Sequence, residues 1–282
     1  MIEAVQNTDA RNDAYSTAAW RNRGPVTAPV VVAGDVHLGS AKANVEAFDG
    51  FLEDLHREQD AGELVLLGDV WDMIRRDPFG CAWDTAGTIR RLQALAERLP
   101  VRLVVGNHDT PLRGLDADRY DIDIDDEHVV EQAGQRIRFC HGNAFDRLQF
   151  DPLSAYLGGA GDRGDIDPTR GRKDPIVAAA REYAGAGRRW LHSVLPLEGP
   201  AGGEAASYSR RERRAHAFLD SVPEDKLVYG HTHAPYVHHD NVAANPGSWT
   251  ATAPTHNTYL RIERGELALF RYHPSRADER LR

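Results

Sequence analysis

Three short apolar runs in the first half of the chain each end in a glycine followed by an oxygen-bearing side chain. The runs and the pairs after them are Val30 to Ala33 with Gly34-Asp35, Leu64 to Leu67 with Gly68-Asp69, and Val101 to Val105 with Gly106-Asn107. Apolar residues at helical spacing fill the intervals, over about 45 to 55 and 85 to 98. This alternation predicts an α/β fold with a mostly parallel sheet. In such sheets ligands bind beyond the carboxyl ends of the strands, where these pairs lie.

The second half of the chain adds more strands and one long interruption. Strands are predicted at Val129-Val130, Ile137 to Cys140, Leu227 to Tyr229, Thr258 to Ile262 and Leu267 to Tyr272. The segment 143–226 is rich in Gly, Arg and Pro, and helical periodicity recurs in it at about 175–195 and 207–219. We therefore divide the chain into a flexible N-terminal arm (1–28), a core in two parts (29–142 and 227–282) and a helical cap insertion (143–226).

Composition disfavours several classes of function. The 282 residues include 34 basic and 43 acidic side chains, a net charge of −9, so nucleic acid is disfavoured as a partner. The two cysteines, Cys81 and Cys140, are too few for a disulfide framework, and we expect a cytoplasmic protein. No stretch resembles a signal peptide or a membrane span. Peripheral membrane contact and the oligomeric state stay open.

Seven side chains of the kinds that bind metals lie at the predicted strand ends. They are Asp35, His37, Asp69, Asn107, His141, His231 and His233. Carboxylate and imidazole donors without a cysteine cluster suit Mn, Fe, Zn, Co or Ni. Seven donors are too many for one tetrahedral ion but suit two ions that share a carboxylate, for which Asp69 is the natural bridge. Each motif alone also fits a turn, a helix cap or a solvated pair, whereas their joint occurrence favours a metal centre.

Five spaced motifs contain these donors. They are Gly34-Asp35-Val36-His37, Gly68-Asp69-Val70-Trp71-Asp72, Gly106-Asn107-His108-Asp109, His141-Gly142 and Gly230-His231-Thr232-His233. In this order the motifs resemble the signature of the calcineurin-like metallophosphoesterases, over about residues 29–272. The resemblance implies a four-layer αββα sandwich, two β-sheets flanked by helices, with an inserted helical cap. The motifs are most similar to the branch that contains UDP-2,3-diacylglucosamine pyrophosphatase.

The resemblance also implies a ligand set and a mechanism. One ion would be held by Asp35, His37, Asp69 and His233, and the other by Asp69, Asn107, His141 and His231. Manganese is the expected metal. A metal-bound hydroxide would cleave a phosphodiester or pyrophosphate bond in a small or lipid-linked substrate, nucleotides included. His108 lies outside the ligand set and is the candidate proton donor to the departing oxygen, and Asp72 would orient it. Asp109 would accept hydrogen bonds from the backbone.

Alternatives remain for the activity and for the cap. A nuclease is disfavoured by the net acidity, and a non-catalytic metal-binding scaffold is disfavoured because every ligand and His108 are present. His108 stands where the pyrophosphatase branch commonly has arginine, and a histidine suits a poorer leaving group such as an alcohol. Residues 163–214 carry eleven basic and seven acidic side chains, which form either an anion funnel or a solvated helical face.

Six further histidines have no motif around them. They are His128, His192, His216, His238, His239 and His256. We interpret them as surface histidines or as histidines with local hydrogen-bond partners.

Overall fold

The computed structural model describes residues 25–115, 120–145 and 210–282, and its strands form two mixed β-sheets. In spatial order, the seven-stranded sheet contains β12 (Glu279–Arg280), β11 (Glu266–Arg271), β10 (Thr258–Glu263), β1 (Val30–Ala33), β2 (Glu63–Leu67), β3 (Val101–Val104) and β4 (Ile122–Asp125). The five-stranded sheet contains β5 (Glu127–Gln132), β6 (Gln135–Cys140), β7 (Lys226–Tyr229), β9 (Ala243–Asn245) and β8 (Tyr236–Val237). Strands β1 to β4 are parallel, as the alternating pattern predicts.

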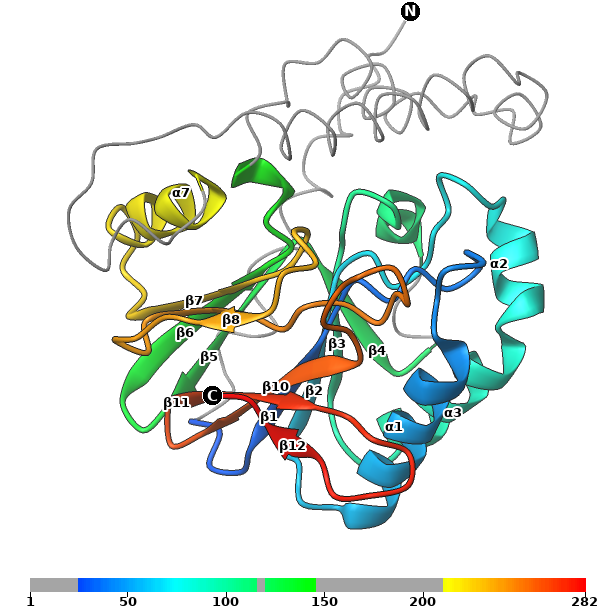
Figure 1. The fold of residues 1–282 in the computed structure, drawn as a ribbon, viewed down its shortest axis with the longest axis horizontal. Coiled ribbons are helices and arrows are strands. Elements are labelled where there is room, and N and C mark those ends of the chain that lie inside the picture. The colour runs from blue at the N-terminus through cyan, green and yellow to red at the C-terminus, as the bar shows by residue number, and fades with distance from the viewer. Residues whose placement is uncertain (1–24, 116–119, 146–209) are drawn as a thin grey trace, which may run out of the picture.

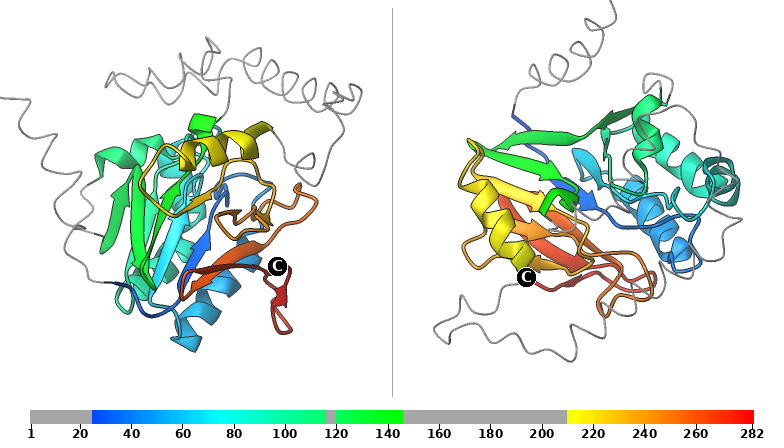
Figure 2. Two further views of the ribbon diagram at one scale, coloured as in Figure 1. Left: turned by 90° about the vertical axis from the view of Figure 1, so that its left-hand side faces the viewer. Right: turned by 90° about the horizontal axis from the view of Figure 1, so that it is seen from above.

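Helices cover the outer faces of both sheets. Helices α1 (Val45–Glu58) and α3 (Ala86–Ala96) lie on the seven-stranded sheet, and α7 (Arg210–Leu219) lies on the five-stranded one (Figures 1 and 2). The short helix α2 (Pro78–Asp84) precedes α3, and single 3-10 turns occupy Thr110–Gly114 and Asn143–Phe145.

Alternation along β1 explains how the layers hold together. Val31 and Ala33 point toward the helices and belong to the core that contains Phe48 of α1. Val30 and Val32 point the other way, into a second core between the two sheets. The order helix, sheet, sheet, helix confirms the α/β class and the expected αββα sandwich.

Most elements coincide with the predicted ones, and the exceptions are short or exposed. The helix expected over 207–219 is α7, whereas the one expected over 175–195 and the arm through residue 24 lie outside the described residues. Helix α2 was not predicted, because Phe79 and Trp83 are 73% and 74% exposed and give no buried stripe. Strands β4, β8, β9 and β12 were also missed; the last three have only two or three residues each.

A buried ionic network joins the two sheets. Glu63 begins β2 and accepts hydrogen bonds from Arg102 of β3 and from His128 of β5, at 3.1 and 3.0 Å. Burial alone would raise the pKa of Glu63, but His128 and then Arg102 outweigh it and lower the pKa. The network lies at the opposite end of β2 from Asp69, so it anchors the sandwich without touching the motif loops.

No helix within residues 25–115, 120–145 and 210–282 is both long enough and apolar enough to span a bilayer.

Candidate metal centre

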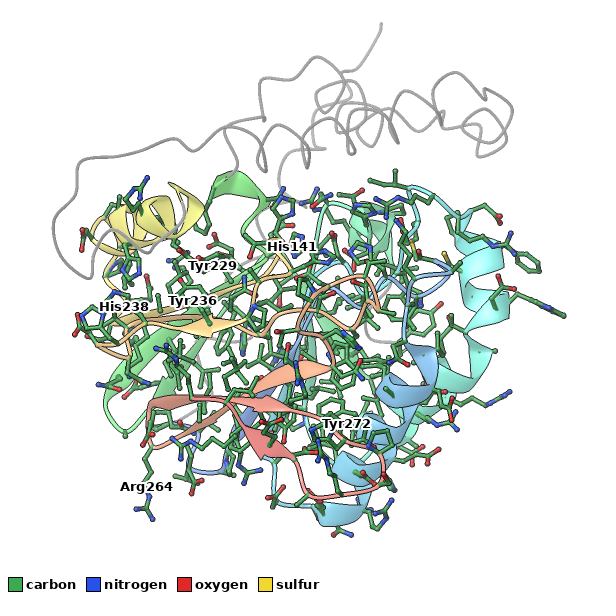
Figure 3. The ribbon with its side chains drawn as sticks, in the orientation of Figure 1. His141, Tyr229, Tyr236, His238, Arg264 and Tyr272 are labelled. Atoms are coloured by element: carbon green, nitrogen blue, oxygen red, sulfur yellow. The ribbon has the colours of Figure 1, made fainter. Side chains whose placement is uncertain are left out.

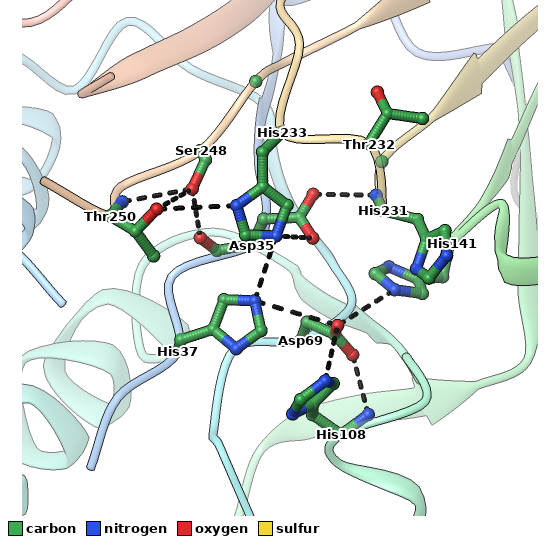
Figure 4. A network of polar contacts seen from close by, with 12 residues as sticks. Asp35, His37, Asp69, His108, His141, His231, Thr232, His233, Ser248 and Thr250 are labelled. Atoms are coloured by element: carbon green, nitrogen blue, oxygen red, sulfur yellow. Dashed lines mark hydrogen bonds and ion pairs between the residues drawn. The ribbon is translucent and has the colours of Figure 1, made fainter. Parts of the chain in front are cut away.

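The seven candidate ligands meet at one edge of the sandwich, where strands of both sheets end. Figure 4 shows six of them; the seventh, Asn107, contacts His141. Asp35 and His37 follow β1, Asp69 follows β2, Asn107 follows β3, His141 follows β6, and His231 and His233 follow β7. The parallel strands of each sheet place their carboxyl ends at this edge, and the packing of the two sheets brings both sets of loops together.

The backbone at this edge is unusual. Asp35, His37, Asp69, His231 and His233 have φ angles of 51°, 55°, 50°, 69° and 56°. They are five of the eleven non-glycine residues with positive φ in the described part of the chain. A side chain in this left-handed region costs free energy, and such residues concentrate at functional sites. The fold therefore maintains local strain to direct these five side chains.

Two motif glycines allow the loops to approach closely. A β-carbon at Gly106 would collide with the carboxylate and the amide nitrogen of Asp69. A β-carbon at Gly68, where φ is +74°, would collide with the ring of His141. Glycine at these positions is what lets Asp69 sit between the loops that follow β3 and β6.

Asp69 lies at the middle of the cluster. Its Oδ1 accepts a hydrogen bond from the backbone N–H of His108 at 2.8 Å. Its Oδ2 is 3.3 Å from Nε2 of His141 on one side and 3.8 Å from Nε2 of His37 on the other. A single carboxylate thus faces ligands of both expected groups.

One group of donors surrounds Asp35. Its Oδ2 accepts from the backbone N–H of His231 at 2.8 Å, while Oδ1 lies 3.3 Å from Nε2 of His233. Nε2 of His233 is in turn 3.2 Å from Nε2 of His37. Oδ1 of Asp35 is buried and makes no hydrogen bond within the described residues, whereas Nδ1 of His37 points away from this group, 3.6 Å from Oδ2 of Asp72. Donor atoms that face a common space in this way fit a bound cation.

The second group surrounds His141. Its Nδ1 donates to the carbonyl oxygen of Leu67 at 3.0 Å, so Nε2 is the atom that faces the other candidate ligands, 3.2 Å from Oδ1 of Asn107. Asp69, His141 and His231 offer ligand atoms that all lie within 4.8 Å of one another. A backbone carbonyl at the remote ring nitrogen is the usual way in which proteins orient a metal-binding histidine.

Electrostatics at this edge favour positive charge. Burial alone would lower the pKa of His141, but the negative charge of Asp69 and then of Asp35 raises it to about 10. Burial would likewise raise the pKa of Asp69, yet the adjacent imidazoles, His141 first, hold it well below its ordinary value. The carboxylates therefore stay ionised, so oxygen and nitrogen donors and negative charge together fit divalent ions.

His108 and Asp72 form a pair beside the ligands. Oδ1 of Asp72 lies 2.7 Å from Nδ1 of His108, and Oδ2 accepts from Arg75 at 2.7 Å. Burial would raise the pKa of Asp72, but the hydrogen bond from His108 and then the nearby ring of His37 hold it far below its ordinary value. Nε2 of His108 is 3.9 Å from Oδ2 of Asp69, so the structure brings His108 within reach of the metal cluster although it was placed outside the ligand set.

The sequence analysis assigned no contact with the candidate ligands to a pair of hydroxyl groups beside His233. Ser248 donates from Oγ to the carbonyl oxygen of Asp35 at 2.9 Å and lies 2.9 Å from Oγ1 of Thr250. Oγ1 of Thr250 is 3.4 Å from Nδ1 of His233. Nothing in the local sequence indicates this role for Thr250, because the contact forms only when the loop after β9 reaches the loop after β7.

Asp109 has the backbone role expected of it. Its Oδ1 accepts from the N–H of Gly106 at 2.6 Å, and its Oδ2 accepts from the N–H of Val70 at 2.9 Å. The buried carboxylate therefore ties the loop after β2 to the loop after β3 and fixes the spacing of Asp69 and Asn107.

Comparisons with known proteins agree with this arrangement of motifs. Residues 28–235 match the calcineurin-like phosphoesterase family. The UDP-2,3-diacylglucosamine hydrolase of Shewanella sp. (strain MR-7) is 26% identical over 222 residues, which cover 73% of this chain and 82% of that protein. The protein of the same name from strain ANA-3 is 25% identical over the same shares.

Solved structures of phosphoesterases also align with the chain. Yfce, a phosphoesterase from E. coli, aligns with a TM-score of 0.43 at 19% identity, covering 90% of this chain and 100% of its own. An archaeal phosphodiesterase aligns with a TM-score of 0.44 at 13% identity, covering 90% and 99%. Since the family match spans well over half of the residues, the chain belongs to the calcineurin-like phosphoesterase family.

Proposed function

We propose that this chain is a hydrolase that uses two divalent metal ions, manganese in the first instance, to cleave a phosphodiester or pyrophosphate bond. The observation that carries the proposal is the gathering of six further donors around the carboxylate of Asp69, beside the pair formed by His108 and Asp72. Asp35, His37, Asp69 and His233 would hold one ion, and Asp69, Asn107, His141 and His231 the other. When bound, the ions supply Lewis acidity that activates water and neutralises charge on the phosphoryl oxygens.

His108 is the residue that moves a proton in this proposal. Its Nδ1 faces Asp72 at 2.7 Å, so Nε2 is the atom of the imidazolium that gives a proton to the departing oxygen. Hydrolysis consumes one water molecule: its oxygen bonds to phosphorus and releases a proton to solvent, while the bond from phosphorus to the leaving oxygen breaks. The leaving oxygen takes the proton from Nε2, and His108 regains a proton from solvent before the next turnover.

Asp72 positions His108. Its carboxylate is fully buried and accepts from Arg75 through the oxygen that His108 does not use. A carboxylate held at both oxygens fixes the orientation and the tautomer of the imidazole, as in other catalytic pairs of this type. Because Nδ1 of His37 is 3.6 Å from the same carboxylate, Asp72 connects the proton donor with a metal ligand.

A small or lipid-linked phosphoester is the substrate class that we propose. The similarity to proteins named UDP-2,3-diacylglucosamine hydrolase supports a nucleotide-linked or lipid-linked substrate. The His108–Asp72 pair supports a leaving group that needs protonation, such as an alkoxide. The same pair favours catalysis over a metal-binding scaffold, since a scaffold has no use for a positioned proton donor. An anion funnel over residues 163–214 stays a prediction, because most of the basic residues of this segment lie outside the described residues.

The proposal is tested with metal-free protein and a chromogenic diester. Protein treated with chelator should not hydrolyse bis-p-nitrophenyl phosphate, and Mn²⁺ should restore the activity. A screen of phosphomonoesters, cyclic nucleotides, nucleotide-sugars and nucleotide-lipids with Mn²⁺ then identifies the bond that is cleaved. Full activity in metal-free protein would contradict the proposal.

A further inference from the structure

A second histidine cluster lies where α7 approaches the turn between β8 and β9. The ring of His238 packs between those of His216 and His239, with centroid separations of 4.3 and 4.2 Å. Asp240 adds a carboxylate, with Oδ1 3.1 Å from Nε2 of His239 and Oδ2 3.8 Å from Nδ1 of His238. Figure 3 shows His238 at the margin of the molecule below α7, well apart from His141 of the candidate metal centre.

The turn that carries three of these side chains is firmly held. The N–H of His238 donates to Ala243 at 2.8 Å, and the N–H of Asn241 donates back to the carbonyl of His238 at 2.9 Å. The side chain of Asn241 then binds both the N–H and the carbonyl of Leu267, at 2.9 and 2.8 Å. His238, His239 and Asp240 are therefore presented by a preorganised loop, which lowers the entropic cost of binding a ligand.

The fourth member of the cluster comes from α7, which is anchored independently. Ala215, next to His216, is fully buried against the five-stranded sheet with Leu227 and Tyr229. One turn further along, the ring of Phe218 lies 5.3 Å from that of Phe145. The position of His216 over the turn is thus set by helix packing.

Three imidazoles and one carboxylate make up a set of donors typical of zinc. Zn²⁺ takes four nitrogen, oxygen or sulfur ligands in a tetrahedral arrangement, and histidine with aspartate is a common combination. His238, His239 and Asp240 offer ligand atoms within 4.8 Å of one another.

The geometry points to a separate metal site here, in which one Zn²⁺ is bound by His216, His238, His239 and Asp240 and ties α7 to the β8–β9 turn. Helix α7 forms the outer layer on the five-stranded sheet, so the ion would fasten this layer to the turn at the end of that sheet. The site shares no ligand with the centre around Asp69, and it does not depend on the proposed hydrolase activity.

The experiment compares the zinc content of matched variants of the full chain. Metal-free protein is dialysed against Zn²⁺ and its bound metal is counted by elemental analysis. The wild type should bind one equivalent more than His238→Ala and one more than His216→Ala, whereas His256→Ala, which removes a histidine elsewhere on the surface, should bind the same amount as the wild type. Zinc bound at the centre around Asp69 contributes equally to the wild type and to each variant. The difference in zinc content therefore reports only on the second site.

Two additional measurements keep the test decisive. Far-UV circular dichroism and the conservative variant His238→Gln show whether a loss of zinc reflects a loss of fold. Zn²⁺ should also slow amide hydrogen exchange in α7 of the wild type by about tenfold or more, with no such slowing in His238→Gln. Equal zinc content in the wild type and His238→Gln would overturn the site, and retention of the extra equivalent in His216→Ala would overturn the tie to α7.

Discussion

Asp72 holds His108 by a contact of 2.7 Å between Oδ1 and Nδ1, and it uses its second oxygen to bind Arg75. The same carboxylate faces the candidate metal ligand His37. This arrangement leaves one nitrogen of His108 available at the ligand cluster and gives it a defined direction. The relationship makes the role of His108 testable apart from metal binding.

Replacing His108 by alanine should slow turnover without removing metal. We expect kcat to fall by about 10² to 10⁴ on an alkyl phosphodiester, because the leaving alkoxide then departs without a proton donor. The loss should be far smaller on bis-p-nitrophenyl phosphate, since p-nitrophenolate needs little protonation. Parallel rate measurements on the two esters, with Mn²⁺ content as the control, check this. An equal loss on both esters would exclude His108 as the acid.

Asp69→Asn should impair binding of both ions. The substitution removes the negative charge that faces His37 and His141 and takes away the proposed bridging oxygen. Asp72→Asn is the matched control, because it makes the same chemical change three residues later at a side chain that is not a proposed ligand. Mn²⁺ titration followed by calorimetry should show two binding events in Asp72→Asn. In Asp69→Asn both binding events should be much weaker or absent. A variant that still binds both ions normally would remove Asp69 from the centre.

Thr250 should act on the metal through His233. If Ser248 donates to the carbonyl of Asp35 and Thr250 donates to Ser248, then Oγ1 of Thr250 is left to accept from Nδ1 of His233, whose Nε2 faces the cluster. Thr250→Val keeps the shape and removes the acceptor, so affinity for Mn²⁺ should fall by about 10- to 100-fold. Thr250→Ser should restore it. Failure of serine to rescue, measured by the same titration, would assign the effect to packing.

The network around Glu63 should contribute to stability in a pH-dependent way. The folded-state pKa of Glu63 lies below its ordinary 4.5, so its contribution is present above that value and is lost as the pH falls through the folded pKa. Glu63→Gln removes the buried ion pair between Glu63 and Arg102. The substitution should therefore reduce the free energy of unfolding by about 3 kcal/mol at pH 7.

The control for this network is a similar pair on the surface. Glu266 binds Arg280 at 2.7 Å, with both side chains more than half exposed, so Glu266→Gln should cost less than about 1 kcal/mol. Urea unfolding curves of the two variants at pH 7 and pH 4 compare them directly. If Glu63→Gln and Glu266→Gln lost the same stability at pH 7, the buried network would have no special role.

Local pattern was enough to locate the strands that end in ligands, but not the contacts between distant loops. The strand from Val30 to Ala33 was predicted at its observed bounds, because a run of four apolar residues that ends at Gly34-Asp35 is typical of a buried strand followed by a turn. His37 and His233 are 196 residues apart in sequence, and only the packing of two sheets brings their rings together. The pairing of these loops was available only through the family resemblance.

Side chains that act through another residue were harder to predict than ligands. Thr250 lies in a loop whose sequence has no metal-binding character, and its role depends on a ring that reaches it from another loop. His216, His238 and His239 were interpreted as surface histidines or histidines with local partners, because α7 and the β8–β9 turn approach each other only in the folded chain. Single-sequence patterns report on one element at a time, whereas these clusters are properties of the packing.

The central claim is that the donors around Asp69 form a dinuclear metal centre. Anomalous diffraction from crystals soaked in Mn²⁺, collected at the manganese edge, tests it most directly. We predict two peaks, one among Asp35, His37 and His233 and the other among Asn107, His141 and His231, with the carboxylate of Asp69 touching both. A single peak, or two peaks of which one does not contact Asp69, would contradict the account.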